Sequence, residues 1–125
     1  MAGKGDRPQV GVRVENVSRR AVLGDTVREA LTPFSRMKGL LGSGGLPPGD
    51  GLWICPCNSI HSFGMRFVFD VLFLGPDMKV VGKYEGFRRN RVSRVFWKAR
   101  GVLELPAGTI ERTGTEVGDE IAFRK

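Results

Sequence analysis

The chain has 125 residues, a formal net charge of +7, 41% hydrophobic and 26% charged side chains. These values are typical of one globular domain and exclude the disordered, collagenous and disulfide-stapled classes. No apolar run approaches the length of a membrane-spanning helix, and the N-terminus lacks the apolar stretch of a signal peptide, so we expect a cytoplasmic protein without a membrane span.

The N-terminal half is predicted to contain three strands and one helix. Residues 9–17 alternate apolar and polar side chains, as in a half-buried strand. A second, short strand is expected over 21–23, ended by a turn at Gly24-Asp25. Thr32-Pro33 has the residues of a helix start, and apolar side chains recur at helical spacing from there to residue 41. A glycine-rich loop then leads to a short strand over 52–54.

The C-terminal half is predicted to be almost entirely β. Strands are expected over 67–74, 79–84, within 95–105 and over 120–123, with a single helical turn over 109–112. The fold class is therefore α+β, mainly β: a compact antiparallel sheet or partly closed barrel of six or seven strands with one or two short helices. We expect a flexible N-terminus over 1–8 and a single, monomeric domain over 9–125.

The positive charge is concentrated in one segment, between Glu85 and Glu104, which has six basic and no acidic side chains. The six are Arg88, Arg89, Arg91, Arg94, Lys98 and Arg100. Aromatic residues are interleaved with them. Basic groups attract phosphates and aromatic faces stack on bases, so the segment is a candidate for weak, sequence-independent binding of RNA or another polyanion. The alternative is a solvated loop whose arginines keep a strand edge from pairing with another chain.

Cysteine, histidine and methionine gather in a second segment, at Cys55, Cys57, His61 and Met65. Two thiols and an imidazole are ligands for Cu(I) or Zn(II), and a cysteine beside a histidine is the pair of a thiol enzyme. A third interpretation is structural, with the cysteines buried as small hydrophobic residues. Because the N-terminus has no export signal, we expect both thiols to be reduced. The spacing fits no common zinc motif and no fourth ligand is evident, so we expect no bound transition metal and no cofactor.

Two acidic residues stand in apolar surroundings. Strand alternation places Phe67, Phe69, Val71 and Phe73 on one face and Val68, Asp70, Leu72 and Leu74 on the other. A carboxylate among such neighbours needs hydrogen bonds, so we expect Asp70 to be buried and to accept them from the loop before it or from an arginine. Glu104, within Val-Leu-Glu-Leu, raises the same question, and Arg36 or Arg66 is its expected partner.

Four blocks of sequence resemble a family of bacterial and archaeal proteins, the domain of unknown function 192. They are Arg36-Met-Lys-Gly-Leu-Leu-Gly42, Phe63-Gly-Met-Arg-Phe-Val-Phe-Asp70-Val-Leu-Phe-Leu74, Val102-Leu-Glu-Leu-Pro-Ala-Gly-Thr109 and Gly118-Asp119. The resemblance covers roughly residues 20–124 and implies a compact, mainly β domain without an established activity. The Cys57-Asn-Ser-Ile-His61 stretch is similar to only part of that family, so chemistry at Cys57 and His61 would not be a shared function.

The leading functional hypothesis is a non-catalytic domain that binds a small molecule or a protein partner. Its candidate pocket residues are Arg36, Cys57, His61, Met65, Asp70 and Glu104, provided that they face one cleft. The alternatives are a thiol enzyme or soft-metal site at Cys57 and His61, with Cys55 as a further ligand, and polyanion binding through residues 88–100.

Overall fold

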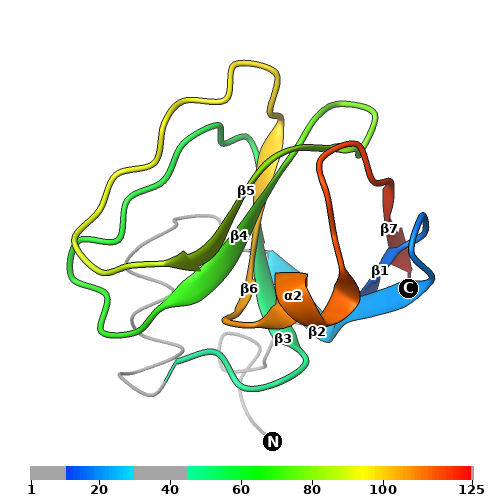
Figure 1. Cartoon of the computed structure of the whole chain (residues 1–125), viewed down its shortest axis with the longest axis horizontal. Coiled ribbons are helices and arrows are strands. Elements are labelled where there is room, and N and C mark those ends of the chain that lie inside the picture. Colours follow the sequence, from blue (N-terminus) through cyan, green and yellow to red (C-terminus); the bar gives the residue numbers. More distant parts are fainter. Residues whose placement is uncertain (1–10, 30–44, 125) are drawn as a thin grey trace, which may run out of the picture.

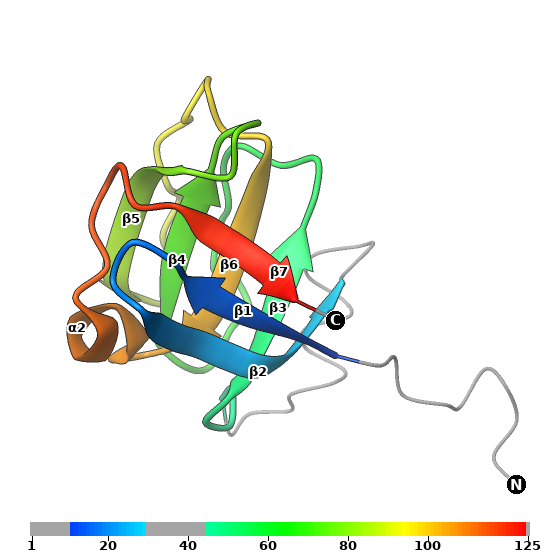
Figure 2. The ribbon, with the colours of Figure 1, turned by 90° about the vertical axis from the view of Figure 1, so that its right-hand side faces the viewer.

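A computed structural model describes residues 11–29 and 45–124 of the chain. In these ranges, seven strands form one curled sheet and one short helix packs beside it (Figures 1 and 2). The elements are β1 (Val12–Asn16), β2 (Ala21–Glu29), β3 (Asp50–Ile54), β4 (Phe69–Leu74), β5 (Val80–Phe87), β6 (Gly101–Pro106), α2 (Thr109–Thr113) and β7 (Ile121–Arg124). This confirms the mainly β fold class.

The strands follow the order β5-β4-β6-β3-β2-β1-β7. All neighbours are antiparallel except β2 and β3, which run parallel. The two ends of the sheet meet where β5 begins. There the Val80 N–H donates to the Asp119 carbonyl over 2.9 Å, and the Gly118 N–H donates to the Val80 carbonyl over 2.8 Å. The sheet is therefore a partly closed barrel, as the sequence predicts.

Two apolar clusters lie on opposite faces of the sheet, and β4 contributes to both. The barrel core takes residues from most strands and from α2: Val14, Leu23, Val27, Leu72, Leu74, Val80, Leu103, Leu105, Ile110 and Ile121. The loop-side core comprises Leu52, Ile54, Ile60, Met65, Phe69, Val71, Phe73, Phe87 and Val102. The predicted alternation along β4 is thus confirmed: Phe69, Val71 and Phe73 face one core and Leu72 and Leu74 the other. Every residue of β4 is buried.

The predicted turn at Gly24-Asp25 is wrong, because β2 continues through it to Glu29. The register with β1 shifts between the pairs Val14–Gly24 and Val12–Val27, so an irregularity within the strand absorbs these residues. The N–H groups of Asp25 and Thr26 both donate to the Gly49 carbonyl, each over 2.9 Å. A glycine followed by an aspartate has the composition of a turn, yet pairing with the next segment keeps the backbone extended.

The strand expected within 95–105 is shorter than that range, since β6 begins at Gly101 and the residues before it form a loop. The single helical turn and the turn at Gly118-Asp119 before the last strand are confirmed. The helix expected over 32–41 and the N-terminus over 1–8 lie outside the described residues. No helix in the described ranges is long and apolar enough to cross a membrane.

Candidate nucleic-acid interface

Two long loops, residues 55–68 between β3 and β4 and residues 88–100 between β5 and β6, lie side by side over the loop-side core (Figure 1). We call them the loop pair. Backbone hydrogen bonds join them along their length. Ser62 N–H donates to the Arg91 carbonyl over 2.8 Å, Ser93 N–H to Ile60 over 2.8 Å, and Cys57 N–H to Arg100 over 3.0 Å. The segment that carries the arginines is therefore held to a second segment along its length.

Side chains fix the loop pair to the sheet. The Phe96 ring lies 4.2 Å from the ring of Phe73, measured between centroids, and it fills the space above Gly82, where a Cβ atom would collide with it. The Tyr84 hydroxyl accepts the Arg94 N–H over 3.0 Å. The Ser62 hydroxyl, fully buried, accepts the Arg91 N–H over 2.9 Å. These contacts order the backbone of the arginine-rich segment before any partner arrives.

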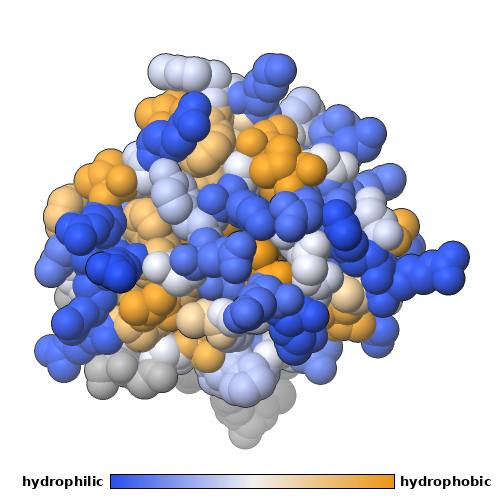
Figure 3. Space-filling view, in the orientation of Figure 1, coloured by the Kyte–Doolittle hydropathy of each residue, from blue (hydrophilic) through white to orange (hydrophobic). Residues whose placement is uncertain are grey.

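All six basic side chains of residues 88–100 are exposed, and so is Arg66 on the facing loop. Large apolar side chains are exposed among them: Trp97 at 83%, Val92 at 64% and Phe63 at 51%. Figure 3 shows apolar residues scattered among strongly hydrophilic ones on the side where the loop pair lies. The basic segment is thus a solvated loop. Solvation alone does not explain why the aromatic rings of Trp97 and Phe63 are also exposed on the loop pair.

The loop pair accounts for the entire net charge of the protein. Its two segments contain seven arginine and lysine residues and no aspartate or glutamate, and the remaining thirteen basic side chains equal the thirteen acidic ones in number. Six of the seven basic residues lie in the segment 88–100 and can be counted in the sequence. Arg66 cannot be assigned to them from the sequence, because only the pairing of the two loops brings its loop beside that segment.

The two cysteines are free thiols with different exposure. Cys55 is exposed, and its Sγ lies 3.5 Å from the Arg100 carbonyl. Cys57 is half-buried against the loop-side core, and its thiol donates to the Ser59 carbonyl over 3.0 Å. Burial raises the pKa of the Cys57 thiol, which is opposite to what a nucleophilic cysteine requires. A hollow of about 280 Å³ lies beside it, lined by Pro56, Cys57, Asn58, Ala99 and Arg100.

His61 and Met65, the other two residues of this cluster, lie in different surroundings. His61 is exposed, pairs with Val92 in an isolated bridge between the loops, and accepts the Phe63 N–H at Nδ1 over 3.3 Å. Met65 is buried in the loop-side core. Within the described ranges, no group of three or more histidine, cysteine, aspartate or glutamate residues is placed to hold a metal ion.

Asp70 is buried as predicted, but its expected hydrogen-bond partners are wrong. Its two carboxylate oxygens accept the N–H of Gly86 over 2.9 Å and the N–H of Ile110 over 2.8 Å, from β5 and α2. Within the described part of the chain, neither the preceding loop nor an arginine binds it. The Gly108 N-cap of α2 has no side chain, so Asp70 caps this helix from a neighbouring strand.

Glu104 lies on the opposite face, between Leu52 of β3 and Val71 of β4. The residue is 2% exposed, and its Oε1 has no hydrogen-bond partner among the residues that the structure describes. Desolvation raises the pKa of its carboxyl group to about 8. The expected pair with Arg66 is wrong, because Arg66 is exposed and the described residues hold no ion pair between them. Arg36, the other expected partner, lies outside the described residues.

The candidate pocket residues therefore divide between two faces of the sheet. Asp70 belongs to the barrel side, whereas Cys57, Met65 and Glu104 belong to the loop side and His61 to the surface. Sequence periodicity assigned Asp70 correctly to the face of Leu72. The periodicity along β4 could not show which face of β6 would lie opposite Asp70.

A family model described as an uncharacterized ACR, domain of unknown function 192, matches residues 14–123. The chain belongs to this family. Its fold is also that of two crystal structures. A putative transcription regulator from Sinorhizobium meliloti 1021 is 25% identical, with a TM-score of 0.69 over 93% of this chain and 98% of that one. A protein of unknown function from Novosphingobium aromaticivorans DSM 12444 is 21% identical, with a TM-score of 0.72 over 95% of this chain and 94% of that one.

The domain of unknown function 192 carries no assigned activity in its description, and no curated protein matches this chain. The matched range spans all seven strands and both loops of the loop pair. The comparisons thus fix the fold and the family, and the function has to be argued from the surface of this member.

Proposed function

We propose that this protein is a non-catalytic binding domain whose partner is single-stranded RNA or DNA, held on the loop pair. The observation that carries the proposal is that the whole net charge of the protein and three exposed apolar side chains, two of them aromatic, lie on the same two hydrogen-bonded loops. Phosphates are attracted by the arginines, and bases stack on aromatic faces. We further propose that the protein is cytoplasmic and monomeric.

Exposed Trp97 and Phe63 favour a single strand over a duplex. The bases of a duplex are stacked on each other, whereas those of a single strand are available to an aromatic ring. Arginine and lysine contacts to phosphates carry no sequence information, so we expect binding that is insensitive to base sequence. The name of the Sinorhizobium protein, a putative transcription regulator, is in keeping with a nucleic-acid partner.

A thiol enzyme at Cys57 and His61 is a weaker candidate. The Cys57 thiol has a raised pKa, and His61 engages Phe63 and Val92 of the loop surface. A general base has to be within hydrogen-bond reach of the group it activates. The Cys57 thiol donates its single proton to the Ser59 carbonyl over 3.0 Å, so a binding role explains the surface better.

We expect that changing Arg88, Arg89 and Arg91 together to glutamate abolishes binding of a labelled single-stranded oligouridine, measured by fluorescence anisotropy at low salt. The wild-type affinity should fall steeply with salt, with a slope of roughly −0.7 in log K against log salt for each phosphate contacted. The circular dichroism spectrum should be unchanged, because all three side chains are exposed.

The matched control reverses Lys79 and Arg112, two exposed basic residues outside the loop pair, and is compared with reversal of Arg88 and Arg89 alone. The two double variants change the net charge by the same amount, so the control should retain most of the affinity if the loop pair is the site. Wild-type protein that shows no binding above background at low salt contradicts the proposal. So does tight binding that persists in high salt and depends on base sequence, because phosphate contacts provide no base readout.

Trp97 allows a second, charge-independent test. Replacing it with alanine should weaken binding by about 1–3 kcal/mol, the usual contribution of one stacked base, whereas Trp97→Phe should retain most of the affinity. The salt slope should be the same in both variants, because neither changes a charge. Equal affinities of the wild type and Trp97→Ala would show that the ring does not stack on a base.

A further inference from the structure

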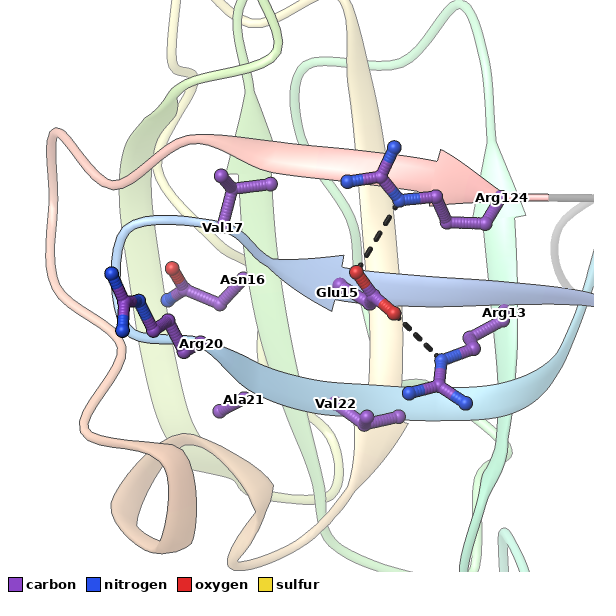
Figure 4. Close-up of a pocket in the computed structure, with 8 residues that line it drawn as sticks. All are labelled: Arg13, Glu15, Asn16, Val17, Arg20, Ala21, Val22 and Arg124. Carbon is purple, nitrogen blue, oxygen red and sulfur yellow. Dashed lines mark hydrogen bonds and ion pairs between the residues drawn. The ribbon is translucent and has the colours of Figure 1, made fainter.

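A second basic surface lies on the exposed face of β7, β1 and β2, away from the loop pair (Figure 2). It is a groove of about 350 Å³. Three arginines border it: Arg13 from β1, Arg20 from the turn between β1 and β2, and Arg124 from β7 (Figure 4). Pockets of this volume are within the range that holds small ligands.

A single acidic side chain, Glu15, stands in the groove and orders two of the arginines. One of its oxygens accepts the Arg13 Nε–H over 2.7 Å, and the other accepts the Arg124 Nε–H over 3.3 Å (Figure 4). Both bonds use Nε, so the terminal nitrogens of both guanidinium groups are not engaged by Glu15. The two arginine side chains are 54% and 55% exposed and accessible to a ligand.

The turn that carries Arg20 is built from buried polar contacts. Asn16 is fully buried; its side-chain oxygen accepts the Arg19 N–H over 3.0 Å, and its amide donates to Thr115 and Asp119, each over 2.9 Å. Arg20 itself has a φ of 55°, in the left-handed region. The fold thus fixes the backbone of Arg20, so the Cα position of the third arginine at the groove is defined.

The groove carries an uncompensated charge of two. Hydrogen bonds from Arg13 and Arg124 lower the pKa of Glu15, so its carboxylate remains ionised at neutral pH beside three permanent cations. Arg112 approaches the groove from α2, with its guanidinium 3.4–3.5 Å from the Val22 carbonyl, and Arg19 pairs with Asp119 behind the turn. Val17, Ala21 and Val22 form the apolar part of the border, and Asn16 also lines the groove.

We propose that this groove binds a dianionic phosphate group, either free or as the monoester of a small organic molecule. Arginine forks pair with phosphate oxygens through two parallel hydrogen bonds, and Arg13 and Arg124 have their terminal nitrogens available for this. The charge of the dianion matches that of the groove. An organic body attached to the phosphate would lie against Val17 and Val22. This site is independent of the proposed nucleic-acid surface.

The test is a titration of isotope-labelled whole protein, followed by NMR of backbone amides and arginine Nε–H groups. Inorganic phosphate at pH 7.5 should give saturable shifts, in the low millimolar range, at Arg13, Arg124 and Arg20. Inorganic phosphate is mostly a dianion at pH 7.5 and almost entirely a monoanion at pH 5.5, so its affinity should decrease several-fold at the lower pH. Sulfate, a dianion at both pH values, should bind equally at both. Adenosine 5′-monophosphate distinguishes the sources: tighter binding than phosphate indicates a monoester, and equal binding indicates the free ion.

Arg13→Gln should abolish the saturable shifts, whereas Arg66→Gln removes the same charge from the loop pair and should leave them intact. Sodium chloride at matched ionic strength measures the non-specific effect of salt. Shifts that do not saturate, that chloride reproduces, or that Arg13→Gln retains would overturn the proposal. Because the readout is local to the groove, its failure would leave the RNA-binding test unaffected.

Discussion

Replacing Glu104 with glutamine is expected to increase the stability of the protein by several kcal/mol at pH 8 and to change it little at pH 4.5. Glu104 is buried, no group in residues 11–29 or 45–124 pairs with its Oε1, and burial raises its pKa from the ordinary 4.5 to about 8. In the unfolded chain the carboxyl group ionises near its ordinary value. Between these two values the folded state retains a proton that the unfolded state releases, so stability decreases as the pH rises.

The size of the effect follows from the width of that pH window. Each pH unit within it lowers the free energy of unfolding by about 1.4 kcal/mol, which amounts to on the order of 3 kcal/mol at pH 7 and 5 kcal/mol above pH 8. Below the unfolded pKa both states are protonated and the difference vanishes. Glutamine has nearly the same shape but does not ionise, so the variant should lack this part of the pH dependence.

Urea unfolding of both proteins between pH 4.5 and pH 8.5 measures the difference directly. The control is Glu120→Gln, which removes an exposed carboxylate. Its stability should follow that of the wild type within about 0.5 kcal/mol at every pH, as for most surface substitutions. A Glu104→Gln variant that is less stable than the wild type at pH 8 would show that Glu104 is ionised and paired in the native protein.

Replacing Asp70 with alanine is expected to cost about 2–4 kcal/mol of stability, since it leaves buried donors without an acceptor. The side chain is 1% exposed and binds the N–H of Gly86 and the N–H of Ile110. Gly86 has a φ of 68° and lies where the register of β5 against β4 is irregular. One carboxylate therefore joins three elements: it anchors the irregular part of β5 and the first turn of α2 to β4.

The control for this prediction is Asp77→Ala. Asp77 is exposed and also accepts a backbone N–H, from Lys79 over 3.2 Å. Water replaces the lost acceptor there, so the cost should remain below about 1 kcal/mol. Chemical denaturation of the two variants compares a buried with an exposed bond of the same type. A loss below about 0.5 kcal/mol for Asp70→Ala would show that the Asp70 bonds contribute nothing.

Local sequence patterns were sufficient for most of the strands. The run Phe67 to Leu74 predicted an apolar strand, which the structure has over Phe69–Leu74, and the assignment of Phe73 and Leu72 to different faces is confirmed. Alternation is a local property of an extended backbone, so it is legible in the sequence. The same patterns failed at Gly24-Asp25, where pairing with another segment decides whether the backbone forms a turn or an irregularity within a strand.

For the loop pair, the sequence by itself determined the composition: a run of arginines without acidic residues, interleaved with aromatic rings. It also determined that Asp70 has to be buried and hydrogen-bonded. Charge and hydropathy belong to the residues themselves, and their density along the chain can be counted.

Only the tertiary structure decided what these residues contact. The partners of Asp70 are 16 and 40 residues away in the chain. The arginines that border the groove on β7, β1 and β2 come from opposite ends of the chain. Periodicity tells which face a side chain occupies but not which element is placed opposite. That choice depends on strand order and on closure of the sheet between β5 and β7, which the packing of the whole barrel determines.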